Sequence, residues 1–228
     1  MDNGERAAVK VWDLPMRIFH WALLALLVFQ VVSGKLGGKL IQWHVYAGYG
    51  VFALVAFRLI WGFAGSTPAR FASFLARPAA ALGFARRLFL RRAEAHPGHN
   101  PLGGWMVIAL LASLAVQIVT GLFSNDGISI EGPLASLIPL GLSDQITKLH
   151  QTNVGVLLAL SATHTAAVLY HWLVLREDLI RAMVTGVKHL RRGDARPAPG
   201  AVFPGPARAL LVLAAALALV ALVVTRGA

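Results

Sequence analysis

The chain has 228 residues, of which 57% are hydrophobic and only 14% are charged, and its formal net charge is +11. A soluble domain has about 25% charged residues, so this composition favours an integral membrane protein. The sequence contains no cysteine, which excludes disulfides, thiolate-bound metals, iron–sulfur clusters and covalently attached c-type haem.

Five runs of mostly apolar residues follow one another along the chain. A helix that crosses a membrane needs about 20 such residues, and each run is long enough. The runs cover residues 15–33, 41–62, 104–123, 149–175 and 207–225. Transmembrane β-strands are not favoured, because they alternate apolar and polar residues over about 10 positions. The sequence therefore predicts an all-α membrane protein in which the first four helices form a bundle and a fifth follows at the C-terminus.

Two segments between the apolar runs differ from them in composition. Residues 78–92, PAAALGFARRLFLRR, predict a basic amphipathic helix on the cytoplasmic membrane surface, with a docking site for a soluble partner as the alternative. Residues 191–206 are rich in proline and glycine and predict a linker. We therefore expect a membrane domain over residues 1–190 and a fifth transmembrane helix within residues 207–228. No repeat with a period of 20 to 50 residues is present.

Lysine and arginine are distributed unequally between the two sides of the predicted helices. Sixteen of them fall on the side of the N-terminus and four on the opposite side, with Arg58 inside the second run. Because cytoplasmic loops are rich in lysine and arginine, we expect a cytoplasmic N-terminus and a periplasmic C-terminus in a bacterial inner membrane. The positive charge is then an orientation signal, and nucleic-acid binding is not expected.

Four histidines lie within the predicted helices. His20 is near the cytoplasmic end of the first run, and His44 is near the outer end of the second. His150 and His164 are fourteen residues apart on the fourth run, which places them on one helix face and about 21 Å apart at 1.5 Å per residue. The directions of the helices place His44 level with His150 on the outer side, and His20 level with His164 on the inner side.

These two pairs suit haem better than a bare metal ion. Zinc normally takes four ligands, and no acidic residue lies near these histidines in the runs. Haem needs only two axial ligands from the protein, and histidine is a standard one in helix bundles. We therefore predict two b-type haems per chain, with the axial pairs His44–His150 and His20–His164. For any single histidine, a packing role without a ligand is the alternative.

Three other residues have two interpretations each. Arg58 lies fourteen residues after His44 at the inner level, where it either pairs with the propionates of the inner haem or extends to the membrane interface. His171 either supports a propionate or a quinone or is exposed to solvent, which is the favoured interpretation. His99 is either part of a quinone pocket or an ordinary loop residue.

Several motifs resemble those of one known family. They are VWDLPMRIFHW, QWHVYAGYGVFALVAFRLIWG, GHNPLGGWM and LHQTNVGVLLALSATHTAAVLYHW, in that order. From about residue 10 to about residue 190 the sequence is similar to the bacterial cytochrome b561 / nickel-hydrogenase b-type cytochrome family. The resemblance implies a four-helix core with two b haems, electron exchange with quinone, and the ligands His20, His44, His150 and His164. The last helix lies outside it.

The favoured function is electron transfer across the cytoplasmic membrane between the quinone pool and a periplasmic partner resembling cytochrome c or a hydrogenase. The outer connection over residues 124–148 carries Asp126, Glu131 and Asp144, which would suit a basic cytochrome c, although a plain polar loop is the simpler interpretation. A quinone-linked oxidoreductase acting on a small molecule such as superoxide is an alternative. A metal or solute transporter is another, but the helices lack the acidic residues and interruptions typical of transporters.

Overall fold

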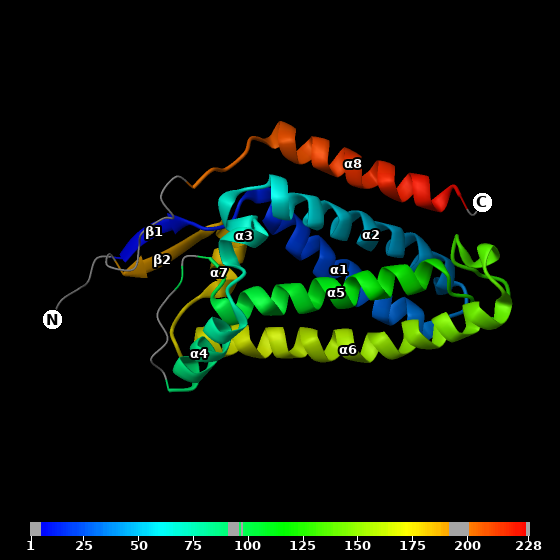
Figure 1. The fold of residues 1–228 in the computed structure, drawn as a ribbon, viewed down its shortest axis with the longest axis horizontal. Coiled ribbons are helices and arrows are strands. Elements are labelled where there is room, and N and C mark those ends of the chain that lie inside the picture. Colours follow the sequence, from blue (N-terminus) through cyan, green and yellow to red (C-terminus); the bar gives the residue numbers. More distant parts are fainter. Residues whose placement is uncertain (1–5, 91–95, 97, 192–200, 227–228) are drawn as a thin grey trace.

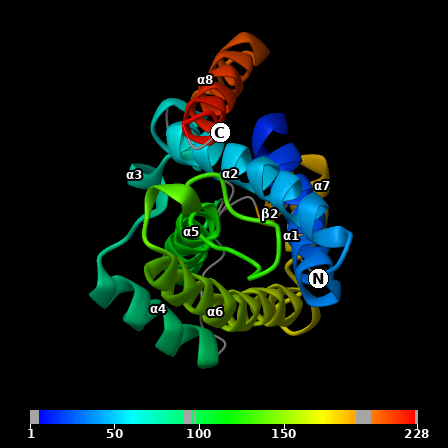
Figure 2. The same cartoon turned by 90° about the vertical axis from the view of Figure 1, so that its right-hand side faces the viewer.

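The computed structural model describes residues 6–90, 96, 98–191 and 201–226. Five of its helices are long and apolar enough to cross a membrane, which confirms the five predicted helices. They are α1 (Leu14–Leu36), α2 (Leu40–Ala64), α5 (Pro101–Leu122), α6 (Leu140–Leu173) and α8 (Pro206–Val224). The first four form a bundle, and α8 lies along α2 on its outside (Figures 1 and 2).

The bounds of the helices follow from their capping residues. Asp13 caps α1 by accepting a hydrogen bond from the amide of Met16 at 2.8 Å, and Asn100 caps α5 through the amide of Gly103 at 2.7 Å. A proline follows each cap within the first turn, where its missing N–H costs nothing. Gly37 and Gly38 have φ of 60° and 55°, a conformation that only glycine adopts readily, and they make the turn into α2.

Helix α6 is longer than predicted, because it begins at Leu140 instead of residue 149. Its first turns carry Ser143, Asp144, Thr147 and Lys148, and hydropathy does not distinguish such a polar helical extension from a loop. The hydroxyl of Ser143 donates to the carbonyl of Phe123 at 2.7 Å and thereby fixes this extension against the end of α5.

A small sheet is present that the sequence analysis did not predict. Strand β1 (Arg6–Lys10) pairs antiparallel with β2 (Val187–Arg191), so that Arg6 lies opposite Arg191. An isolated pair of such short strands is marginal. This one is stabilised by a buried cluster at its base: Val9, Val11, Trp12, Ala182 and Leu190. We call this end of the bundle the sheet end, and the opposite end, with the α1–α2 turn and the α5–α6 connection, the loop end.

Shorter elements surround the sheet end. They are a 3-10 turn (Thr67–Ala69), α3 (Phe71–Phe74), α4 (Pro78–Phe89) and α7 (Leu179–Thr185), while a second 3-10 turn (Ala135–Leu137) lies at the loop end. The amphipathic helix predicted over 78–92 is present as α4, which packs against α5. Residues 91–92 of that prediction and residues 192–200 of the predicted linker lie outside the described residues.

Two apolar clusters hold the membrane helices together. One joins α1, α2 and α8 through residues such as Met16, Trp61 and Ala216. The other joins α2, α5 and α6 through residues such as Val55 and Leu114. The four histidines described below lie on α1, α2 and α6 of this bundle.

Candidate functional site

The structure brings the four predicted histidines together in two facing pairs. At the loop end, His44 of α2 and His150 of α6 have ring centroids 6.2 Å apart, with ring planes at 80°. At the sheet end, His20 of α1 and His164 of α6 have ring centroids 6.4 Å apart, with ring planes at 53°. The partners in each pair are those that the helix depths predict.

These separations fit two imidazoles bound to one iron between them. A histidine nitrogen lies about 2.0 Å from a bound metal, and the ring centroid lies about 1.1 Å behind that nitrogen, so two rings on opposite sides of an iron are about 6.2 Å apart. In the described part of the chain, no group of three or more His, Cys, Asp or Glu side chains is arranged to hold a bare metal ion. A pair of histidines suits a metal that brings its other ligands with it, as haem does.

The imidazole of His44 is held with its proton on Nδ1. This nitrogen lies 3.0 Å from the carbonyl oxygen of Gln30 and 3.2 Å from the hydroxyl of Ser33. The Ser33 hydroxyl donates its proton to the carbonyl of Phe29 at 2.7 Å, and a carbonyl only accepts. Nδ1 must therefore be the donor, which leaves the lone pair of Nε2 free for a metal.

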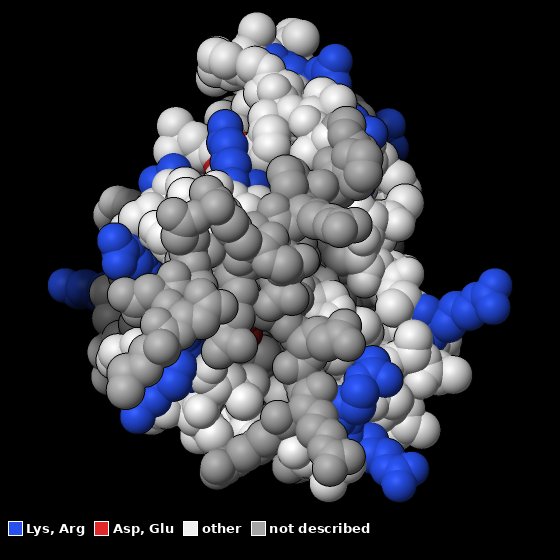
Figure 3. Space-filling view, turned by 90° about the vertical axis from the view of Figure 1, so that its left-hand side faces the viewer, with Lys and Arg blue, Asp and Glu red and all other residues white. Residues whose placement is uncertain are grey.

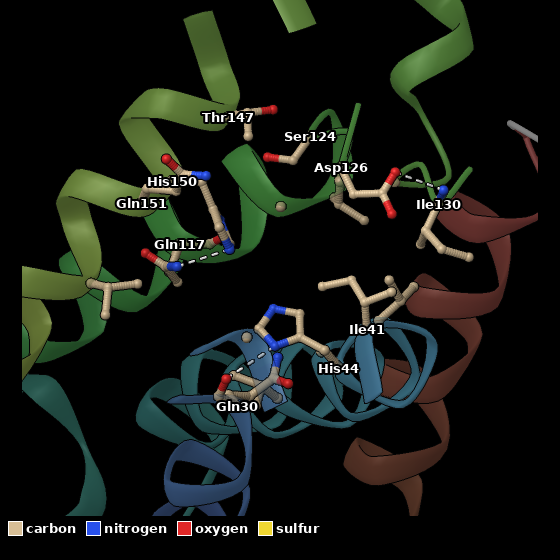
Figure 4. Close-up of a pocket in the computed structure, with 18 of the residues that line it drawn as sticks. Gln30, Ile41, His44, Gln117, Ser124, Asp126, Ile130, Thr147, His150 and Gln151 are labelled. Carbon is tan, nitrogen blue, oxygen red and sulfur yellow. Dashed lines mark hydrogen bonds between the residues drawn. The ribbon is translucent and has the colours of Figure 1, made fainter. Parts of the chain in front are cut away.

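His150 is held in the same way on the other side. Its Nδ1 lies 3.0 Å from the carbonyl of Gln117 and 3.1 Å from the hydroxyl of Thr120, which donates to the carbonyl of Val116. Its Nε2 accepts a hydrogen bond from the side-chain amide of Gln117 at 3.0 Å (Figure 4). That contact confirms that Nε2 carries the lone pair, and the Gln117 amide has to move aside for a metal to bind there.

A cavity of about 1070 Å³ opens between His44 and His150. Sites for drug-sized ligands are about 300–1000 Å³, so this one is large enough for a macrocycle. Figure 4 shows both imidazoles pointing into it from opposite sides, with Asp126 and Ile130 of the α5–α6 connection at its edge. Lys35 also lines it. Backbone amides, first that of Ile128, hold the pKa of the Asp126 carboxyl below its usual range.

Each loop-end imidazole closely approaches one glycine of the neighbouring helix. A Cβ on Gly34 would come within 3.0 Å of Cε1 of His44, and a Cβ on Gly121 within 3.0 Å of Cε1 of His150. Neither the two glycines nor the hydroxyls beside them were predicted from the sequence. The signal was available as two matching pentapeptides, QVVSG at 30–34 and QIVTG at 117–121.

We expect Gly34→Ala and Gly121→Ala to lower the occupancy of the loop-end site, because each added methyl group displaces an imidazole by a few tenths of an ångström. Cofactor content per chain in purified protein measures this. Gly141→Ala is the matched control, because a Cβ there meets nothing within 4 Å. Equal occupancy in all three variants would contradict the role assigned to the two glycines.

The sheet-end pair has a different environment. Nδ1 of His20 is buried without a hydrogen-bond partner among the described residues. Arg58 is 1% exposed, so it does not extend to the surface, and this contradicts that alternative interpretation. Both of its terminal nitrogens lack hydrogen-bond partners within the described ranges, and its guanidinium lies 4.8 Å from the ring centroid of Phe71. An anionic group between these residues would satisfy it.

His99 lies beside this pair. Its ring contacts Trp12 and Phe74, each with a centroid distance of 4.7 Å, and its Nδ1 is buried without a partner among the described residues. Burial and the positive charge of Arg58 lower the pKa of His99 to about 3. His164, Lys188 and His20 act in the same direction. His99 is therefore a neutral side chain within the sheet-end cluster of cationic groups.

His171 is buried, so the favoured prediction that it is exposed to solvent was wrong. Its Nδ1 lies 2.6 Å from Oε2 of Glu177, whose other oxygen lies 2.5 Å from Nζ of Lys188. Burial on its own would raise the pKa of Glu177, but the hydrogen bond from His171 and the charge of Lys188 lower it to about 2. This network was not predicted from the sequence, because its members come from α6, the following loop and β2.

Comparison with family models identifies a family for this chain. The family model described as prokaryotic cytochrome b561 matches residues 11–186 of the chain. A search of curated proteins finds no match. The matched segment contains all four paired histidines and Arg58, and it ends before β2 and α8.

Proposed function

Because the chain belongs to the prokaryotic cytochrome b561 family, whose members are b-type cytochromes that transfer electrons in membranes, we propose that it binds two b haems and carries electrons across the cytoplasmic membrane. Its partners are then the quinone pool on one hand and a periplasmic redox protein, resembling cytochrome c or a hydrogenase, on the other. The observation that supports this best is the pair of facing imidazoles at each of two depths.

The residues have separate roles in this proposal. His44 and His150 hold the loop-end haem, and His20 and His164 hold the sheet-end haem. Arg58 is buried with free donors, and we assign it to the propionates of the sheet-end haem, with which an arginine forms charge-assisted hydrogen bonds. When bound, each haem supplies a one-electron couple, and the bundle keeps water away from it.

The distribution of charge supports an orientation. Figure 3 looks onto the sheet end, where lysine and arginine side chains surround the face and acidic side chains are scarcely visible. Exposed basic residues near this end include Lys10, Arg77, Arg86, Arg87, Arg176 and Arg181. Since positive residues gather on the cytoplasmic side, we place the N-terminus and the sheet end in the cytoplasm, and the loop end and the C-terminus in the periplasm.

The periplasmic surface in this orientation contains the acidic α5–α6 connection. Asp126, Glu131 and Asp144 are exposed there. Complementary charge accelerates the encounter of redox proteins, so these residues favour a partner with a basic face. Electrons from that partner would enter through the haem held by His44 and His150.

Vesicles test this function directly. The haem-loaded protein is reconstituted with ferricyanide trapped inside and a membrane-impermeant reductant outside. We expect wild-type vesicles to reduce the trapped ferricyanide and His44→Ala vesicles to do so at the rate of protein-free vesicles, because one haem of the route is lost. Equal rates for wild-type and protein-free vesicles would contradict a transmembrane route.

A further inference from the structure

The two halves of the bundle are similar in sequence. Residues 22–34 of α1 read ALLALLVFQVVSG, and residues 109–121 of α5 read ALLASLAVQIVTG, with eight of the thirteen positions identical. The helices that follow share a second spacing, since His44 and Arg58 on α2 are as far apart as His150 and His164 on α6. Both hairpins also run in the same direction in Figure 1. The bundle is thus built from two related hairpins, α1–α2 and α5–α6.

This similarity is preserved at the loop end. In each hairpin, the histidine of the second helix packs against the glutamine-to-glycine segment of the first helix. Nδ1 of His44 contacts a carbonyl and a hydroxyl of residues 30–34, and Nδ1 of His150 contacts a carbonyl and a hydroxyl of residues 117–121. The two loop-end imidazoles therefore have nearly equal environments, and both donate from Nδ1 to an oxygen.

At the sheet end, the two hairpins carry different residues at matching positions. The position of the first hairpin that matches His164 is occupied by Arg58, and the position of the second hairpin that matches His20 is occupied by Val107. Nδ1 of His20 has no hydrogen-bond partner among the described residues, and the hydroxyls that flank His164, those of Thr163 and Thr165, donate to carbonyls of their own helix. A buried cation has replaced one member of a symmetric pair.

These differences would shift the reduction potentials of haems bound at the two ends in opposite directions. A hydrogen bond from Nδ1 to an oxygen makes the imidazole a more basic ligand, which gives more electron density to its metal, and this stabilises the ferric state. A nearby cation disfavours the ferric state, which is the more positive of the two. An iron at the loop end would have both ligands hydrogen-bonded in this way, whereas an iron at the sheet end would have Arg58 in the same cluster of residues around His99 as its two ligands.

Resting on the function proposed above, we infer that segments 30–34 and 117–121 give the loop-end haem the lower reduction potential of the two. With both haems bound, one electron would pass from the haem held by His44 and His150 to the haem held by His20 and His164, so that the first is oxidised and the second reduced. A one-electron periplasmic donor would supply each electron, and two such electrons together with two protons would reduce one quinone to quinol. Moving an electron inward costs free energy when the membrane potential is negative inside. The difference in reduction potential between the two haems would offset this cost.

A redox titration followed by visible absorption tests the order of potentials. His44→Ala and His20→Ala assign the two components, because each removes one of them. We expect the component that His44→Ala removes to have the lower midpoint in wild-type protein. We also expect Ser33→Ala combined with Thr120→Val to change the one-electron equilibrium of that component about tenfold towards the reduced form, which equals about 59 mV. The sheet-end component keeps its midpoint.

Thr152→Val is the matched control, because this hydroxyl lies two residues from His150 but donates only to the carbonyl of Lys148, at 2.8 Å. We expect it to leave both midpoints unchanged. The inference is overturned if His44→Ala removes the component with the higher midpoint, or if the double variant shifts neither component. Either result with two haems still bound leaves the proposed function standing, whereas protein without haem contradicts the function itself.

Discussion

His44→Ala and His150→Ala are each expected to lower the haem content from two per chain to one, and both remove the same spectral component. His20→Ala and His164→Ala are expected to remove the other component. The reason is that a six-coordinate haem held between two helices loses an axial bond and the contact with one of those helices. Haem quantitation and the reduced-minus-oxidised spectrum of each purified variant measure both effects.

A histidine outside the pairs provides the control for these variants. His189 on β2 is exposed, so His189→Ala is expected to keep both components at wild-type amounts. The pairing itself is contradicted if His20→Ala and His44→Ala abolish the same component while sparing the other. Loss of both components in every variant would instead indicate a general failure to fold, which far-UV circular dichroism detects.

Glu177→Ala is expected to be strongly destabilising. The carboxylate pairs with Lys188 at 2.5 Å and accepts from His171 at 2.6 Å, and both partners are buried, with 6% exposed. Removing one member of a buried ion pair leaves an uncompensated charge, which costs about 3–5 kcal/mol. We therefore expect a clearly lower Tm in detergent. Glu131→Ala is the control, because Glu131 is an exposed carboxylate at the loop end and such substitutions change stability by about 0.5 kcal/mol or less.

The network of His171, Glu177 and Lys188 makes the protein less stable as the pH falls. The folded protein holds the pKa of Glu177 at about 2, below its ordinary value of 4.5. A carboxyl with a depressed pKa contributes stability that is fully present above the unfolded pKa and is lost as the pH falls through the folded one. Wild-type protein should therefore lose stability between about pH 4.5 and about pH 2, and Glu177→Ala should lose less in that window. Parallel curves for the two proteins would contradict this role.

Much of the architecture could be predicted because its causes are local in the sequence. Long apolar runs specify membrane helices on their own, and their alternating directions fix the depth of any residue along them. That is why the partners of His44 and His20 could be named before any contact was known. Arg58 could be placed level with the inner pair in the same way, although only its burial in the structure excludes the interpretation in which it extends to the membrane interface.

The features that were missed depend on contacts between distant segments. Strand β1 pairs with β2 about 180 residues later, and five-residue strands carry no periodic signal of their own. His171 was expected in solvent because nothing near it in the sequence indicates that Glu177 and Lys188 enclose it. The acceptors for Nδ1 of His44 lie on the preceding helix, and only the repeat of QVVSG as QIVTG indicates them from sequence.

The most direct test of the two imidazole pairs is the number of haems per chain in protein purified from haem-replete cells, measured with its reduced-minus-oxidised spectrum. Two facing pairs of the observed spacing predict two b haems, each coordinated by two histidines. Well-folded protein that binds no haem, or that retains both haems after His44→Ala, would contradict them.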